Sequence, residues 1–350
     1  MIKNVLDLLP EELIQQLLDI GEKEYRAKQI LNWVYNKYTI DFNEMTSLSE
    51  ALRTKLQSIL DITIPTIITK SNSTDGTTKY LLSLQDGSNI EMVIIPNGKK
   101  NTLCISSQVG CARKCEFCAT AKLGLKRNLE THEITSQVFL AIKELGGKKL
   151  TNVVFMGMGE PLDNFENVVK AIRILQNDIC FNFSPRRITV STSGVIPQIT
   201  KLAETGLKLK LAVSLNSAIQ SKREILMPIS KIFPLPELKK ALIDFRKKTP
   251  YRITFEYVMI KDFNLGKEDV KALLKYLGDI SCKLNVIKWN KVDDLPYETP
   301  TTGEIDRFIS AISVLSSAVT YRRSRGADID AACGQLAARN TQRRSDHEEF

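Results

Sequence analysis

The chain reads TLCISSQVGCARKCEFC over residues 102–118, an apolar run that leads into three closely spaced cysteines. Cys111, Cys115 and Cys118 can surround one face of a metal centre, and their soft sulfur atoms suit zinc or an iron–sulfur cluster. Three cysteines leave one iron of a cubane [4Fe-4S] cluster open to a further ligand. The triplet follows directly on an expected strand, which favours a cluster at the end of that strand.

The other four cysteines bear on whether the triplet binds this cluster or zinc. A stable zinc site needs a fourth ligand, and no histidine lies near the triplet, so only Cys104 or Cys333 could supply it. Cys180 and Cys282 lack a polar motif around them and are interpreted as small core residues.

Working outward from the triplet, strands and helices alternate along the chain, which predicts a parallel sheet. We expect an α/β fold, a (β/α) barrel that is closed or partly closed. The expected strands are 102–107, 152–158, 187–193, 208–216, 252–260, 282–290 and 318–324. The expected helices are one around Ile134–Leu145 and others near 164–176, 195–204, 235–248, 266–277 and 302–316.

The first 97 residues differ from the alternating part. Residues 1–62 predict a small helical accessory region, and 63–97 predict a β-rich connector with turns at Asp75-Gly76 and Asp86-Gly87. The barrel with its C-terminal cysteine segment is expected over 98–336, followed by a polar tail over 337–350.

Charge and hydropathy limit the partners. Lys plus Arg (49) exceed Asp plus Glu (40), and the net charge of +9 favours a polyanionic partner, nucleic acid first. No signal peptide is recognisable, and the longest uncharged run is too short and too rich in serine to cross a bilayer. We therefore expect a cytoplasmic protein without a membrane partner, whose cysteines are ligands or catalytic thiols rather than a disulfide framework.

Small and polar residues stand at the ends of successive expected strands. Because parallel strands end at one edge of a sheet, these residues are expected to bind one ligand together, although each alone is equally typical of a turn or a cap. The candidates are Gly159, Glu160, Ser191, Ser214, Leu215, Asn216 and Asn290.

The spacing of the triplet, with Phe117 before its last cysteine, resembles the radical S-adenosylmethionine superfamily. Within it, the runs Cys104–Cys111, Gly157–Pro161, Ser191–Gly194 and Asp328–Leu336 look like those of the bacterial RNA (adenine-carbon 2) methyltransferases and their carbon 8 relatives. Pro161 matches the carbon 2 branch, where the carbon 8 branch tends to have Ala. The chain departs from the family at Asn216, where His is common.

The resemblance implies a two-stage reaction. Cys111, Cys115 and Cys118 would hold a [4Fe-4S] cluster, and two S-adenosylmethionine molecules would be used per turnover, one as methyl donor and one as radical source. Cys333 would carry the methyl group, and Cys104 would release the product through a transient disulfide with Cys333. Glu91 matches the family's proton acceptor, and Cys104 is a second candidate for that role.

The resemblance also implies the partners. These are 23S rRNA in the peptidyl-transferase region, tRNA at the adenine beside the anticodon, and a low-potential electron donor such as flavodoxin or ferredoxin, with the enzyme acting as a monomer. The target adenine has to be unstacked to reach a buried site. Basic residues that could contact phosphates are Lys122, Lys126, Arg127, Arg186, Arg187, Lys208 and Lys210.

Two other functions fit part of the pattern. One is a radical enzyme that acts on a small molecule or a protein, which would not need a methyl-carrying Cys333. The other is a non-catalytic RNA-binding module stabilised by zinc. The residues alone do not settle carbon 2 against carbon 8, or rRNA against tRNA.

Overall fold

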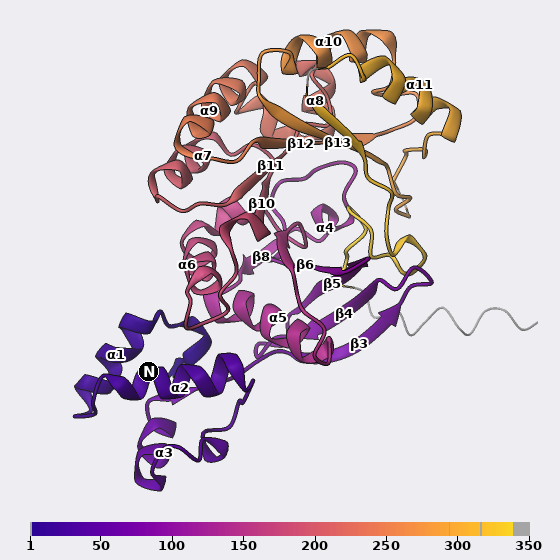
Figure 1. The fold of residues 1–350 in the computed structure, drawn as a ribbon. Helices are drawn as coiled ribbons and strands as arrows, with labels where there is room; N and C mark the ends of the chain where they lie inside the picture. The colour runs from indigo at the N-terminus through magenta and orange to yellow at the C-terminus, as the bar shows by residue number, and fades with distance from the viewer. Residues whose placement is uncertain (1, 294, 316, 339–350) are drawn as a thin grey trace, which may run out of the picture.

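The structure, a computed structural model, describes residues 2–293, 295–315 and 317–338 (Figure 1). Over these residues the main sheet has ten strands in the order β14-β13-β12-β11-β10-β9-β6-β5-β4-β3. The first seven in that order run parallel. They are β14 (Ala318–Tyr321), β13 (Cys282–Lys288), β12 (Ile253–Met259), β11 (Lys210–Ser214), β10 (Ile188–Thr192), β9 (Asn152–Phe155) and β6 (Lys100–Cys104).

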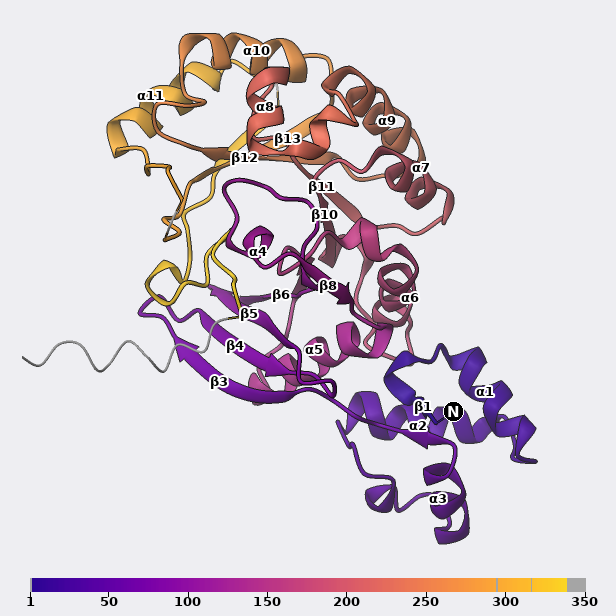
Figure 2. The same ribbon diagram turned by 180° about the vertical axis from the view of Figure 1, so that it is seen from behind.

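Helices cover the outer side of this curved sheet, as both views show (Figure 2). Their apolar faces join the sheet in one large hydrophobic core. Along β9 and β10, buried residues alternate with half-buried ones, so one face of the sheet packs in this core and the other face is less covered. The covering helices are α5 (Thr131–Glu144), α6 (Phe165–Gln176), α7 (Ile196–Glu204), α9 (Leu235–Lys248), α10 (Lys267–Leu277) and α11 (Thr302–Ile312). Because β14 and β3 end the sheet at opposite edges in the described residues, the barrel is open.

The expected β-rich connector continues this same sheet. β3 (Thr66–Asn72), β4 (Thr78–Ser83) and β5 (Asn89–Asn97) pair antiparallel with one another, and β5 pairs with the first barrel strand, β6. Glycines with positive φ stand at both predicted turns, Gly76 and Gly87, where a left-handed residue is needed. The connector therefore lengthens one edge of the barrel wall.

The N-terminal region forms a second hydrophobic core beside the barrel (Figure 1). Phe139 of α5 and Ile174 of α6 extend into this core, and the Thr135 hydroxyl of α5 donates to the Leu6 carbonyl at 2.8 Å. Its helices thus pack directly on the barrel's outer helices. The elements are β1 (Lys3–Asn4), α1 (Pro10–Asp19), α2 (Tyr25–Asn36), α3 (Glu50–Gln57) and β2 (Leu60–Asp61).

The predicted α/β class and partial (β/α) barrel are confirmed, and several details differ. The strand expected over 102–107 is β6, which begins at Lys100 and ends at Cys104, and residues 105–107 lie between it and a separate short strand, β7 (Gln108–Gly110). The last expected helix, 302–316, ends at Ile312. The short elements that were not predicted include β7 itself, α4 (Ala119–Lys122), β8 (Leu125–Asn128) and α8 (Gln220–Leu226).

None of the helices in the described part of the chain is long and apolar enough to span a membrane. The predicted polar tail lies outside the described residues from position 339 onward.

Candidate active site

The three clustered cysteines lie on a loop that a small two-stranded sheet closes at its base. β7 and β8 pair antiparallel, and the Cys111 amide donates to the Gly124 carbonyl at 2.9 Å. Gly110 has φ of +78°, and a Cβ there would overlap the Gly124 carbonyl oxygen, so only glycine fits. The backbone thus fixes both ends of this cysteine loop, residues 111–124.

Side-chain and backbone contacts fix the middle of the loop. Arg113 forms a two-pronged ion pair with Asp163, in which its Nε donates at 2.6 Å, and the Glu116 amide donates to the Leu226 carbonyl at 3.0 Å. The loop is therefore tied both to the segment after β9 and to the end of α8.

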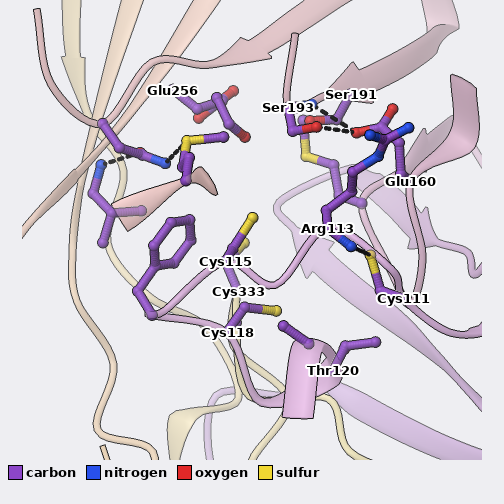
Figure 3. Close-up of a pocket in the computed structure, with 18 of the residues that line it drawn as sticks. Cys111, Arg113, Cys115, Cys118, Thr120, Glu160, Ser191, Ser193, Glu256 and Cys333 are labelled. Carbon is purple, nitrogen blue, oxygen red and sulfur yellow. Dashed lines mark hydrogen bonds between the residues drawn. The ribbon is translucent and has the colours of Figure 1, made fainter. Parts of the chain in front are cut away.

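The loop's sulfur atoms face a cavity of about 160 Å³ (Figure 3). Cys111, Cys115 and Cys118 all line this cavity, which we call the thiol cavity. Burial raises the pKa of Cys111 to about 12 and raises the pKa values of Cys115 and Cys118 as well. Such buried thiols lose their protons when a metal centre binds them.

The three thiols lie on one loop and line one cavity, which is the set of ligands that a [4Fe-4S] cubane with one open iron requires.

Glu160 also lines the thiol cavity, near Ser193, and is almost fully buried (Figure 3). Its carboxylate accepts hydrogen bonds from the Ser193 amide at 2.7 Å, the Ser193 hydroxyl at 2.8 Å and the Leu162 amide at 3.1 Å. Burial raises the pKa of Glu160, which these hydrogen bonds partly offset. A carboxylate in this position can receive an ammonium group from the cavity.

The glycine before Glu160 has a different local role from the one expected. Gly159 lines the cavity with φ of +100°, but a Cβ there would lie 2.6 Å from the Gln108 Cβ. Gln108 of β7, at the base of the cysteine loop, thus occupies the space that a side chain at position 159 would need. This close approach packs the loop after β9 against the base of the cysteine loop.

The predicted residues at the next strand ends behave unequally. Ser191 of β10 and Ser214 of β11 line the thiol cavity, as expected. The Leu215 side chain is fully buried in the hydrophobic core and is not among the described residues that line the cavity, so only its backbone could contact a ligand there. An apolar side chain directly after β11 instead packs into the core.

The two predicted asparagines also differ. Asn216 lines the cavity, but its Oδ1 accepts from the Val258 amide at 2.9 Å and its Nδ2 contacts the Met227 sulfur at 3.2 Å. Its amide therefore holds the loop after β11. Asn290 donates to the Cys333 carbonyl at 3.2 Å, while its buried Oδ1 has no partner and is available to a ligand.

A second cavity, of about 580 Å³, adjoins the first. It is lined by Cys104 together with Arg322, Arg323 and Arg325, and we call it the arginine cavity. Cys333 is exposed and lines both cavities, and both Cys104 and Cys333 are free thiols. Two cysteines that lie 229 positions apart in the sequence, at 104 and 333, thus face one cavity.

Burial raises the pKa of Cys104 to about 12, and the neighbouring Cys333 adds to that rise. The Arg322 guanidinium acts in the opposite direction on Cys104, and its own pKa is raised mainly by Cys333. One arginine therefore lies within electrostatic reach of both thiols.

Glu91, predicted as a proton acceptor, lies away from this chemistry. It is 1% exposed on β5 and is not among the described residues that line either cavity. Its Oε1 pairs with Lys79 at 3.0 Å, and its Oε2 accepts from the backbone amides of Ala337 and Ala338.

Sequence reasoning missed Arg223, the largest of the fully buried side chains. Its Nη2 donates to the carbonyls of Ser193 at 2.8 Å and Ser214 at 3.0 Å, so one guanidinium joins the ends of β10 and β11. The signal was present, because Arg223 falls on the inward stripe of α8 at helical spacing from Ile219 and Leu226.

Glu256 was missed as well. It lines the thiol cavity from β12, its Oε1 accepts from Asn285 at 3.0 Å, and its buried Oε2 has no partner. Burial raises the pKa of Glu256. A lone carboxylate in the apolar run Ile253–Met259 could have identified it, because a central parallel strand is otherwise apolar.

Comparison with known proteins identifies the family. Residues 3–62 match the ribosomal RNA large subunit methyltransferase N-terminal domain, and residues 105–277 match the radical SAM superfamily. The chain is 44% identical over 337 residues to the probable dual-specificity RNA methyltransferase RlmN of Dictyoglomus turgidum, covering 96% of this chain and 97% of that protein. The chain belongs to the RlmN family.

Two further relatives support this assignment. The dual-specificity RNA methyltransferase RlmN of a Marinomonas species is 42% identical over 343 residues, which cover 95% of this chain and 92% of that protein. The crystal structure of a radical SAM methyltransferase from Sphaerobacter thermophilus matches with a TM-score of 0.92 and 39% identity, covering 96% of this chain and all of that one.

Membership of the RlmN family makes the protein an RNA methyltransferase of the radical SAM type, which confirms the predicted family and enzyme class. The zinc-stabilised binding module and the radical enzyme with a non-RNA substrate are thereby wrong. The superfamily uses a [4Fe-4S] cluster and S-adenosylmethionine. In the described residues, three thiols and the unpartnered acceptor atoms of Glu256 and Asn290 line the same cavity, and this set fits these two groups.

Proposed function

We propose that this enzyme methylates carbon 2 of adenine in 23S rRNA, in the peptidyl-transferase region, and in tRNA beside the anticodon. The observation that carries the proposal is the place of Cys333, whose side chain faces the thiol cavity on one side and the arginine cavity on the other. A sulfur reached from both sides can receive a methyl group in one cavity and pass it to a base in the other. Pro161, which lines the thiol cavity, agrees with the carbon 2 branch.

Each cavity has its own task in this proposal. Cys111, Cys115 and Cys118 hold the cluster, while Gly159, Glu160, Ser191, Ser214 and Asn290 surround the bound cofactor, with Asn216 holding the loop behind them. One S-adenosylmethionine molecule would supply the methyl group. A second, cleaved at the cluster, would supply the 5′-deoxyadenosyl radical. The arginine cavity has the size typical of small-molecule sites and the charge that an RNA nucleotide needs.

Cys333 and Cys104 carry out the transfer. Cys333 accepts the methyl group at its sulfur, gives up one hydrogen atom from that methyl, and bonds through the resulting carbon to the ring, whose unpaired electron would return to the cluster. After the carbon 2 proton has left the ring, Cys104 as thiolate attacks the Cys333 sulfur, so that a disulfide forms as the bond from sulfur to carbon breaks and the released carbon takes up a proton to complete the methyl group. An external thiol reduces the disulfide and restores both cysteines.

The carbon 2 proton of the ring has to go to a base. Of the two candidates from the sequence, Cys104 lines the arginine cavity and Glu91 does not, so we assign the proton to Cys104. Its high pKa makes its thiolate a strong base once formed.

The remaining partners follow from the family resemblance. We propose a low-potential donor such as flavodoxin or ferredoxin for the electron, a monomeric enzyme and a cytoplasmic location. The three arginines of the second cavity support an RNA partner, and a flipped adenine would enter there.

Mass mapping of adenines tests the proposal. RNA from cells with and without the gene is digested, and the modified adenines in rRNA and tRNA are located. We expect 2-methyladenine at both kinds of site only when the gene is present. 8-Methyladenine, or no difference in either RNA, would contradict the assignment.

A further inference from the structure

The segment that carries Cys333, residues 326–338, lies against β4 and β5, which are inner strands of the sheet. We call it the Cys333 segment. Its start is held at the β3–β4 turn, where the Gly326 amide donates to Asp75 Oδ2 at 3.0 Å and the Ser73 hydroxyl donates to Asp328 at 2.6 Å. The structure thus attaches it to the antiparallel strands, outside the parallel part of the barrel.

A buried ion pair lies under this segment. Lys79 of β4 and Glu91 of β5 are diagonal neighbours on one face of the sheet, because Lys79 pairs in register with Val93 and Leu81 pairs with Glu91. Lys79 Nζ lies 3.0 Å from Glu91 Oε1, with side-chain exposures of 6% and 1%. Charges buried this deeply need all their hydrogen bonds satisfied.

Both members of the pair complete their hydrogen bonds on the Cys333 segment. Lys79 Nζ donates to the Asp330 carbonyl at 3.3 Å, three residues before Cys333. Glu91 Oε2 accepts from the Ala337 amide at 2.8 Å and the Ala338 amide at 3.0 Å, just after it. One ion pair therefore holds the chain on both sides of Cys333 and closes it into a loop.

The remaining contacts direct this loop toward the cysteine loop. The Ala119 amide donates to the Gly334 carbonyl at 2.7 Å, and the Thr120 hydroxyl donates to the Leu336 carbonyl at 2.7 Å. Both donors belong to α4, directly after Cys118. The ion pair presses the Cys333 segment against the helix that follows the cluster ligands, and this sets where the Cys333 sulfur lies.

We propose that Lys79 and Glu91 are positioning residues that fix Cys333 between the two cavities, and that Glu91 is not the base of the reaction. The inference rests on the proposed role of Cys333 as methyl carrier. A catalytic base has to reach the ring, whereas both oxygens of Glu91 are bound away from either cavity. Loss of a base at Glu91 would block removal of the ring proton, whereas loss of the Glu91 contacts to the Cys333 segment would move Cys333. The two roles can therefore be told apart by experiment.

The decisive variant replaces both charges, Lys79→Met together with Glu91→Met. Exchanging a buried ion pair for apolar side chains of similar size commonly leaves the fold intact, whereas a single replacement leaves one unpaired buried charge. The conservative Glu91→Gln keeps an acceptor oxygen for the two amides. Asp328→Ala, at the exposed outer end, loosens the segment without touching the core.

Hydrogen exchange of the cluster-loaded enzyme gives the first readout and needs no turnover. In the double variant we expect amides of residues 330–338 to exchange at least about tenfold faster, since each lost hydrogen bond removes protection of this order. Glu91→Gln should lie between it and the wild type, and peptides from α10 should not change. Unchanged exchange at 330–338 in the double variant would overturn the proposal.

The second readout is the ratio of 5′-deoxyadenosine to methylated adenine. A misplaced Cys333 should leave cofactor cleavage in place while product falls, so the ratio should rise in the double variant and, less, in Asp328→Ala. Glu91→Gln that accumulates a covalent RNA–protein adduct with normal exchange would instead identify Glu91 as the base. If Cys333→Ala still methylates RNA, the proposed function fails, while the exchange result remains informative about the segment.

Discussion

The two walls that meet at the active site are built in opposite ways. The cysteine loop is local: its three thiols lie between β7 and β8, and backbone pairing closes it. The Cys333 wall is assembled from distant parts, since residues 326–338 are held by Asp75, Lys79 and Glu91 from strands far earlier in the chain. Positioning the cluster ligands therefore depends mainly on local pairing, to which Arg113 and Glu116 add contacts with distant segments, whereas placing the methyl-carrying sulfur depends wholly on distant parts of the chain.

The largest expected effect is on the local wall. Cys115→Ala should abolish cluster binding and all cleavage of S-adenosylmethionine, because two thiolates cannot hold the cubane in place of three. Iron and sulfide analysis after anaerobic purification, with absorbance near ~400 nm, measures it. Cys282→Ala, a buried thiol outside the site, is the matched control and should keep the cluster.

On the distant wall, Cys333→Ala should separate the two stages. The variant should keep its cluster and still form 5′-deoxyadenosine, but it should transfer no methyl group to RNA, because the carrier sulfur is missing. Mass spectrometry of labelled RNA measures this. Methylated product from this variant would contradict the role of Cys333 as the methyl carrier.

Cys104→Ala should stop the reaction one step later. A covalent RNA–protein adduct should accumulate as a shifted gel band, because no thiol is left to release the product. In the wild type, burial raises the pKa of Cys104 to about 12, so its thiolate fraction grows about tenfold per pH unit below that value. Adduct release should therefore become faster as pH rises from 7 to 9; a flat profile would count against Cys104 as the attacking thiol.

The smallest expected effect is at Arg223, which links the strand ends beside the local wall. Arg223→Lys keeps the charge but not the planar fork, so it should weaken binding of S-adenosylmethionine by about tenfold, equivalent to about 1.4 kcal/mol. Calorimetric titration of the cluster-loaded enzyme measures it. Lys222→Met, the neighbouring cation that pairs with Asp269, is the control and should bind normally.

The same contrast explains what could be predicted from the sequence. The alternating βα pattern and the triplet at 111–118 depend on neighbours in the chain, so the barrel and the thiol cavity were predictable. The burial of the Leu215 side chain could not be predicted, because strand ends alone do not show which side chain turns into the core. The Lys79–Glu91 pair was missed because its further partners are a carbonyl and two amides of a distant segment, which leave no pattern in a single sequence. The burial of Arg223 could have been read from the inward stripe of α8, but its carbonyl partners could not.

The closed base of the cysteine loop has a consequence for damage by oxygen. Because β7 and β8 tie residues 110 and 124 together through the backbone, the entropy of closing the loop is already met before any iron arrives. Oxidative loss of the metal should then leave an intact protein scaffold, so that repair needs only fresh iron and sulfide and no new synthesis or refolding of the chain.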